Sequence, residues 1–100
     1  MSHKLTVVAQ VRAKPGKEDE TRRVLLALVA PTRAEAGCIN YDLHQSHDDA
    51  ALFLFYENWE SKSHLDAHAR SAHIQAFRAR VGDLLAEPVE IRLFTMVGQP

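Results

Sequence analysis

Ala51-Leu52-Phe53-Leu54-Phe55-Tyr56-Glu57-Asn58-Trp59-Glu60 is the part of this 100-residue sequence that most constrains the fold. It reads as a β-strand, in which successive side chains point to opposite faces of the sheet. One face would carry Phe53, Phe55, Glu57 and Trp59, and the other Leu52, Leu54, Tyr56 and Asn58. Both faces are largely apolar, yet a chain of this length with two or three helices can cover only one of them. We therefore expect the second face to pack on another copy of the chain, which gives a homodimer through sheet faces.

The face that carries Phe55, Glu57 and Trp59 would be the one that forms a site. The strand runs directly into a stretch that holds histidines at positions 64, 68 and 73. Aromatic rings, a carboxyl group and imidazoles would then meet between the sheet and the helices. This combination predicts a small buried pocket.

Alternating and helical patterns on both sides of this strand predict the rest of the fold. Strands are predicted at residues 4–12, 38–46, 51–59 and 89–97, and helices at 17–35, at 61–68 and from 71 to Pro88. Pro31 cannot donate a hydrogen bond to Ala27, so the first helix should kink or restart there. Gly37 suits the left-handed position that follows a helix. The order β-α-β-β-α-α-β is typical of an α+β ferredoxin-like domain, with one antiparallel sheet and helices on one side.

The second predicted strand places its polar and apolar side chains on opposite faces. Ile39, Tyr41 and Leu43 would face one way, and Cys38, Asn40, Asp42 and His44 the other. Only one of Asn40 and Tyr41 can point at the helices in a regular strand. If Tyr41 is that residue, its hydroxyl would reach the pocket.

The composition narrows the class of protein. The net charge is −1, without the clustered excess of Lys and Arg that binds nucleic acid. No apolar run approaches the roughly 20 residues that cross a bilayer, and no signal peptide precedes the first strand. The single cysteine, Cys38, excludes an intramolecular disulfide and a cysteine-based metal cluster. We expect one domain over residues 1–100, located in the cytoplasm, without a nucleic-acid or membrane partner.

His64, His68 and His73 are the first candidates for chemistry. A histidine titrates near neutral pH, so it can serve as a general base. His64 and His68 are four residues apart and would share one helix face, a spacing that can also chelate a metal. Surface or helix-capping roles are the plainer alternative. No third ligand is fixed by the spacing, so we predict no metal site.

Glu57 is the second candidate. Burial beside Phe55 and Trp59 would disfavour its charged form and raise its pKa, unless a partner compensates. Such a carboxyl group would orient a histidine or hold a substrate hydroxyl. Alternatively, Trp59 belongs only to the core, and Glu57 pairs with an arginine or lies at the sheet edge.

The motifs occur in an order that matches a known family. The sequence contains Pro15-Gly16, Gly37-Cys38-x-x-Tyr41, Phe53…Glu57-x-Trp59, Leu65-x-x-His68-x-x-Ser71-x-His73 and Phe77. This ordered set spans nearly the whole chain and resembles the antibiotic biosynthesis monooxygenase (ABM) domain, especially the small bacterial quinol monooxygenase-like proteins. The resemblance implies a dimeric α+β barrel, in which two ferredoxin-like sheets pack face to face.

The resemblance also implies an activity, because the best studied members of that family oxidise phenols or quinols with O2 and without metal, flavin or haem. This chain would then be an oxidoreductase with no cofactor, acting on a small aromatic or quinol-type substrate. A base would deprotonate the phenol, and the anion would react with O2 to a hydroperoxide that collapses to a quinone. The residues implied are His68 or His73 as the base, Glu57 as its orienter or a substrate contact, Trp59, Phe55 and Phe77 as aromatic walls, and Tyr41 and Asn40 as polar contacts.

Three other functions remain open from the sequence. Some relatives in the family are isomerases of small phosphorylated diketones, and the pocket would also suit a dimer that binds a metabolite without turnover. A neighbouring family with the same fold degrades haem and has an asparagine on its first strand. The first strand here, Leu5 to Arg12, contains no asparagine, which argues against the haem function.

Overall fold

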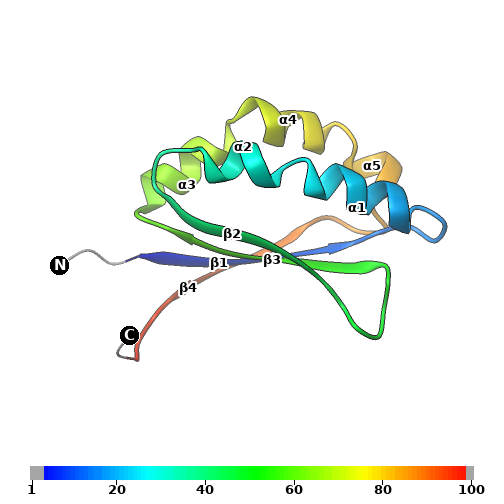
Figure 1. Ribbon diagram of the computed structural model, residues 1–100, viewed down its shortest axis with the longest axis horizontal. Helices are drawn as coiled ribbons and strands as arrows, with labels where there is room; N and C mark the ends of the chain where they lie inside the picture. The colour runs from blue at the N-terminus through cyan, green and yellow to red at the C-terminus, as the bar shows by residue number, and fades with distance from the viewer. Residues whose placement is uncertain (1–3, 99–100) are drawn as a thin grey trace.

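The computed structural model describes residues 4–98, which form one antiparallel sheet covered on one face by helices (Figure 1). The strands are β1 (Leu5–Arg12), β2 (Cys38–Gln45), β3 (Leu52–Trp59) and β4 (Glu90–Thr95). Their order in the sheet is β2-β3-β1-β4, and all neighbouring pairs are antiparallel. The predicted α+β ferredoxin-like fold is thereby confirmed.

The helices follow the predicted order but are divided into shorter pieces. They are α1 (Glu18–Leu26), α2 (Val29–Arg33), α3 (Lys62–Ala69), α4 (Ala72–Arg78) and α5 (Val81–Leu84). The first predicted helix breaks at residues 27 and 28 and restarts before Pro31, as expected from a residue that lacks a backbone N–H. The helix predicted from residue 71 to Pro88 is likewise two helices, because the chain turns at residues 79 and 80. None of the helices among residues 4–98 is long and apolar enough to cross a membrane.

Two serines and one glycine fix how the helices leave and rejoin the sheet. The side chains of Ser61 and Ser71 cap α3 and α4 by accepting hydrogen bonds from the backbone N–H groups of His64 and Ile74. Gly37 has a φ of 80°, and a Cβ there would lie only 2.2 Å from the His64 ring. Glycine is therefore required where the chain enters β2.

The helix-covered face of β3 forms the centre of the core. Phe53, Phe55, Glu57 and Trp59 all lie on this face and are at most 4% exposed. Val7, Ala9 and Val11 of β1 lie opposite Glu57, Phe55 and Phe53 in the strand register, and they are buried with them. The predicted alternation in this strand is correct, and it places a carboxyl group among apolar side chains.

The beginning of β2 departs from the predicted alternation. The register with β3 shifts between Cys38 and Asn40, so Ile39 is an extra residue and is 51% exposed. Cys38 instead packs against the core. The prediction that Ile39 faces the helices with Tyr41 was wrong, because a bulge reverses the side-chain direction on its two sides. Tyr41, beyond the bulge, points at the helices and is 2% exposed.

No helix among residues 4–98 covers the other face of the sheet (Figure 1). Large apolar side chains on this face include Tyr56 and Phe94, which are 40% and 49% exposed. The edge strand β4 is also open on its helix side, where Ile91 and Leu93 pair with Ala9 and Val7. The molecule therefore has an uncovered apolar sheet face and an opening beside β4.

Candidate functional site

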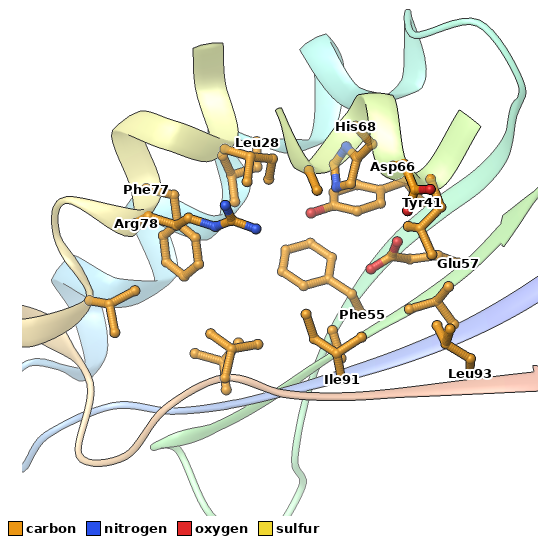
Figure 2. Close-up of a pocket in the computed structure, with 18 of the residues that line it drawn as sticks. Leu28, Tyr41, Phe55, Glu57, Asp66, His68, Phe77, Arg78, Ile91 and Leu93 are labelled. Carbon is orange, nitrogen blue, oxygen red and sulfur yellow. The ribbon is translucent and has the colours of Figure 1, made fainter. Parts of the chain in front are cut away.

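A cavity of about 350 Å³ lies between the covered face of the sheet and helices α3 and α4 (Figure 2). Its walls are mainly apolar and include Ala9, Phe55, Phe77, Ile91 and Leu93. The polar side chains that line it are Tyr41, Glu57, Lys62, Asp66, His68 and Arg78. A mostly apolar cavity with a few convergent polar groups is the usual form of a small-molecule site.

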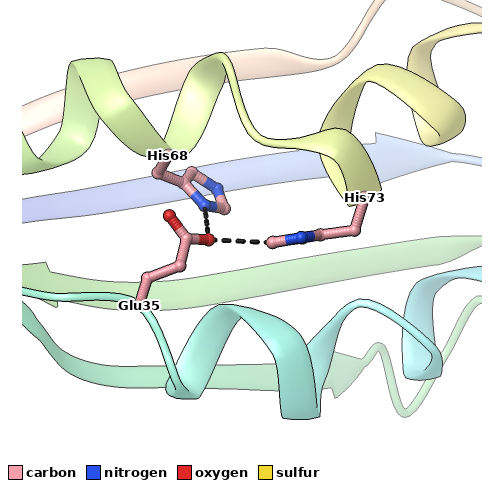
Figure 3. A group of neighbouring side chains, drawn as sticks. All are labelled: Glu35, His68 and His73. Atoms are coloured by element: carbon pink, nitrogen blue, oxygen red, sulfur yellow. Dashed lines mark hydrogen bonds and ion pairs between the residues drawn. The ribbon is translucent and has the colours of Figure 1, made fainter.

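His68 is the imidazole that lines this cavity. It lies near the end of α3, is 7% exposed, and packs against the ring of Trp59 with a centroid separation of 4.7 Å. The ring of Tyr41 approaches it edge-on at 5.5 Å. His68 Nδ1 lies 2.7 Å from Glu35 Oε2 (Figure 3). These contacts hold the ring in one orientation.

The same oxygen of Glu35 also binds His73. His73 Nε2 is 2.8 Å from Glu35 Oε2, so one carboxylate oxygen joins the two imidazoles (Figure 3). A carboxylate can only accept hydrogen bonds, and each of these ring nitrogens must therefore carry a proton. In neutral His68 the proton is then on Nδ1, and Nε2 keeps its lone pair. His68 Nε2 makes no hydrogen bond to any residue in the range 4–98.

Burial lowers the pKa of His68 below its ordinary value, although the neighbouring Glu35 acts in the opposite direction. The imidazole is consequently neutral around pH 7. A neutral imidazole with an unprotonated nitrogen in an apolar cavity is suited to accept a proton from a bound molecule.

Glu57 is the buried carboxyl group of the cavity. Burial raises its pKa to about 7, even though Trp59 Nε1 donates a hydrogen bond of 2.9 Å to its Oε1 and lowers the pKa in part. This agrees with the pKa shift predicted for a glutamate between Phe55 and Trp59. Near neutral pH this group exchanges between an acid that donates a hydrogen bond and a carboxylate that accepts one.

Tyr41 completes the polar end of the cavity. Its ring stacks on Phe55 with a centroid separation of 4.5 Å. Burial raises the pKa of the Tyr41 phenol above its ordinary value, so the hydroxyl stays protonated. Tyr41 can therefore donate a hydrogen bond but is not available as a base near neutral pH.

The structure brings together most of the residues singled out in the sequence. His68, Glu57, Phe55, Phe77 and Tyr41 line the cavity. Trp59 is fully buried behind it, between His68 and Glu57. His73 contacts the site through Glu35 and is not one of the lining residues.

Two of the residues considered in the sequence lie elsewhere. Asn40 is on the opposite face of the sheet, where its side chain binds Asn58 and the backbone carbonyl of Tyr56. His64 binds the helix-capping hydroxyl of Ser61 at 2.7 Å, so it does not join His68 in a chelating pair.

Glu35 was not identified from the sequence. It lies between α2 and β2, where the helical pattern ends and no strand pattern has begun. One signal was available, because an acid just beyond the C-terminal end of a helix is disfavoured by the helix dipole. Such a residue needs another partner, and the two imidazoles supply it.

Glu35, His68 and His73 are also the residue types of a divalent metal site. One ligand-type atom from each lies within 4.8 Å of the other two. Hydrogen bonds of 2.7 and 2.8 Å from both rings to one oxygen already account for this arrangement without an ion.

Comparison with known proteins places the chain in a family. Residues 4–80 match the family described as "Antibiotic biosynthesis monooxygenase". A Mycobacterium tuberculosis protein named "Putative monooxygenase Rv0793" is 41% identical over 91% of this chain and 89% of its own length. An Escherichia coli protein named "Probable quinol monooxygenase YgiN" is 31% identical over 87% of this chain and 94% of its own length.

A solved structure shows the same architecture. The crystal structure of PA3566 from Pseudomonas aeruginosa superposes with a TM-score of 0.93 and 40% identity, covering 98% of both chains. The family match covers most of the chain, and the resemblance drawn from the motifs is confirmed. The chain belongs to the antibiotic biosynthesis monooxygenase family.

Proposed function

We propose that this protein is a monooxygenase that needs no metal, flavin or haem and oxidises a small phenol or quinol with O2. The observation that carries the proposal is the imidazole of His68, which lines the cavity and is held through Nδ1 by Glu35, so that its unprotonated nitrogen near pH 7 is Nε2. The name of the Escherichia coli relative, a probable quinol monooxygenase, supports the same substrate class.

The first step is removal of the substrate's hydroxyl proton by His68 Nε2. The imidazolium that forms is stabilised by the adjacent Glu35 carboxylate. The same hydrogen bond keeps the ring from turning, so that Nε2 has one position before the substrate binds. His73 holds Glu35 from its other side and acts as a positioning residue.

The later steps need no external reductant, because O2 is the oxidant and the phenolate itself supplies the electrons. One electron passes from the phenolate to O2, and the resulting radicals combine at a ring carbon that bears hydrogen, ortho or para to the oxygen. His68 returns its proton to the peroxide. Loss of the ring proton and cleavage of the O–O bond then release water, so a phenol and O2 become a quinone and H2O. A hydroquinone would become a hydroxyquinone in the same way.

The remaining cavity residues have roles that follow from their positions. Phe55 and Phe77 provide flat apolar walls for an aromatic ring, and they exclude water from the anion. Tyr41 and protonated Glu57 can donate hydrogen bonds to substrate oxygens. Trp59 fixes the position of Glu57 and packs on His68 from outside the cavity.

The reaction is tested with a panel of phenols and hydroquinones under ¹⁸O2. The proposal predicts enzyme-dependent O2 uptake, with one ¹⁸O atom in the organic product and the other in water. Heat-denatured protein serves as the control for spontaneous oxidation. Formation of product under anaerobic conditions would indicate an isomerase, and hydrogen peroxide without label in the product would indicate a simple oxidase; either result would overturn the proposal.

We also propose that the uncovered sheet face packs on a second copy of the chain. Val8, Leu54, Tyr56 and Phe94 give this face an apolar surface that no helix covers. Large exposed apolar patches commonly mark protein interfaces. Sedimentation should give at least twice the monomer mass for the wild type, and the monomer mass for Tyr56→Glu.

The matched control for the dimer is Leu26→Glu, because Leu26 is 46% exposed on α1, on the helix side of the sheet. This variant should keep the dimer. A wild-type monomer at micromolar concentration would contradict the packing proposal.

A further inference from the structure

Of the two cationic side chains, Lys62 and Arg78, that line the cavity, only Arg78 has no opposite charge in contact with it among residues 4–98. It is the last residue of α4, and Figure 2 shows its side chain directed at the cavity from the side opposite Glu57. Arginine side chains at a helix end usually extend into solvent. Here the residue is exposed, but its guanidinium is directed at an apolar cavity, where it can contact a bound ligand.

The other charged groups of the cavity are already accounted for. Lys62 and Asp66 pair with each other at 2.6 Å on α3. Glu57 accepts the indole N–H of Trp59 and carries only part of a negative charge near neutral pH, since burial raises its pKa. The charge left over in the cavity is therefore positive, and it is located at Arg78.

The position of Arg78 defines two ends of the cavity. His68, Tyr41 and Glu57 lie together at one end, and Arg78 lies across from them beside Phe77 (Figure 2). A ligand that places a hydroxyl at His68 would present its far end to the guanidinium. Guanidinium groups bind carboxylate and phosphate oxygens in paired hydrogen bonds.

We propose that the natural substrate is a hydroxylated aromatic compound with an anionic substituent, a carboxylate or a phosphate, which Arg78 binds at the end remote from the reacting hydroxyl. This inference rests on the proposed function for the hydroxyl end, but it concerns recognition at the other end. Arg78 is then the residue that selects acidic phenols over neutral ones.

Binding of matched ligands tests this selection without turnover. Isothermal titration calorimetry is performed under anaerobic conditions with para-hydroxybenzoate, its methyl ester and para-hydroxyphenyl phosphate. The wild type should bind one of the two anions at least about tenfold more tightly than the ester, the size expected for a charged hydrogen bond. Whichever anion binds more tightly identifies the carboxylate or the phosphate as the substituent.

The variant Arg78→Gln should bring the affinity for the anion down to that for the ester. Arg70→Gln is the matched control, because Arg70 is also an exposed arginine without an ion-pair partner among residues 4–98 but does not line the cavity. It should keep the preference for the anion. Equal affinities of the wild type for the anions and the ester, or a loss in Arg78→Gln that is equal for all three ligands, would overturn the inference.

The two proposals fail in different ways. If no phenol is oxidised but Arg78 still gives a preference for the anion, the proposed recognition is supported and the proposed monooxygenase activity is refuted. If labelled oxygen enters the product of neutral phenols and the anions are not preferred, the proposed activity is supported and the proposed role of Arg78 is refuted.

Discussion

The two carboxyl groups near the cavity, half-buried Glu35 and buried Glu57, are in opposite situations. Glu35 lies at the junction of the helices and accepts hydrogen bonds from two imidazoles on one oxygen. Glu57 lies on the sheet, accepts one indole N–H, and is otherwise surrounded by apolar side chains that raise its pKa to about 7. One environment fixes the location of a proton, and the other leaves the protonation state variable.

The difference shows how a small fold can supply two chemical roles from one residue type. Glu35 does not line the cavity, so it can act only through His68. Glu57 does line the cavity and can contact a bound molecule directly. Two acidic groups in different surroundings are a recurrent feature of sites that carry out proton transfer.

The largest effect is expected at His68, whose side chain binds Glu35 and lines the cavity. Replacing His68 with Asn removes the proposed base, so the rate of O2 uptake should fall by about 10²- to 10⁴-fold. The matched control is His47→Gln, since His47 is exposed in the loop between β2 and β3 and should leave the rate unchanged. Retention of more than a tenth of the activity in His68→Asn would exclude His68 as the base.

Glu57 should make the stability of the protein depend on pH. Its pKa in the folded protein, about 7, is above its ordinary value of 4.5, so the folded form keeps a proton that the unfolded form releases in this range. The free energy of unfolding should therefore fall as the pH rises from about 4.5 to about 7, by roughly 3 kcal/mol at most. Glu57→Gln should remove this decline.

Urea unfolding at about pH 5 and about pH 8 measures this contribution, as the difference between the wild type and Glu57→Gln. Glu60→Gln is the control, because Glu60 is exposed and three residues away. The same decline in Glu57→Gln as in the wild type would show that Glu57 is not the titrating group.

Glu35→Gln tests the other carboxyl group. The glutamine amide can donate to one imidazole and accept from the other, so the proton of His68 is no longer confined to Nδ1. We expect kcat to fall by about 10- to 100-fold, the cost of a lost charged hydrogen bond, with little change in KM. Glu35→Asp, which keeps the charge, should recover part of kcat; a change in KM alone would place Glu35 in substrate binding instead.

The smallest effect is expected at Ser71, which contacts His68 and His73, the two residues that bind Glu35. Its hydroxyl caps α4, donates to the carbonyl of His68 at 2.7 Å, and lies 3.3 Å from His73 Nε2. Ser71→Ala should lower the free energy of unfolding by about 1 kcal/mol. Ser63→Ala, at an exposed serine in α3, should lower it by much less.

The fold was predictable because its signals are local and repeat along the chain. The alternation in β3 depends only on neighbouring residues of that strand, and the structure agrees with it. The bulge at Ile39 was missed, since a one-residue shift of register depends on the partner strand and leaves no mark in the sequence of β2 itself.

The candidate site was predictable only in part, for a related reason. His68 and Glu57 stood out because a histidine near an aromatic strand and a glutamate within it are unusual in sequence. Glu35 is 33 positions from His68 in the chain, and only the packing of the helices brings the two together. The direction of Arg78 into the cavity likewise depends on the end of α4 and not on its pattern.

The central claim is that neutral His68 carries its proton on Nδ1, toward Glu35, and offers Nε2 to the cavity. The most direct test is ¹⁵N nuclear magnetic resonance of the labelled protein slightly above neutral pH, with His68→Asn used to assign the ring signals. The account predicts a protonated Nδ1 and an unprotonated Nε2. A proton on Nε2, or an imidazolium protonated at both nitrogens under these conditions, would contradict it.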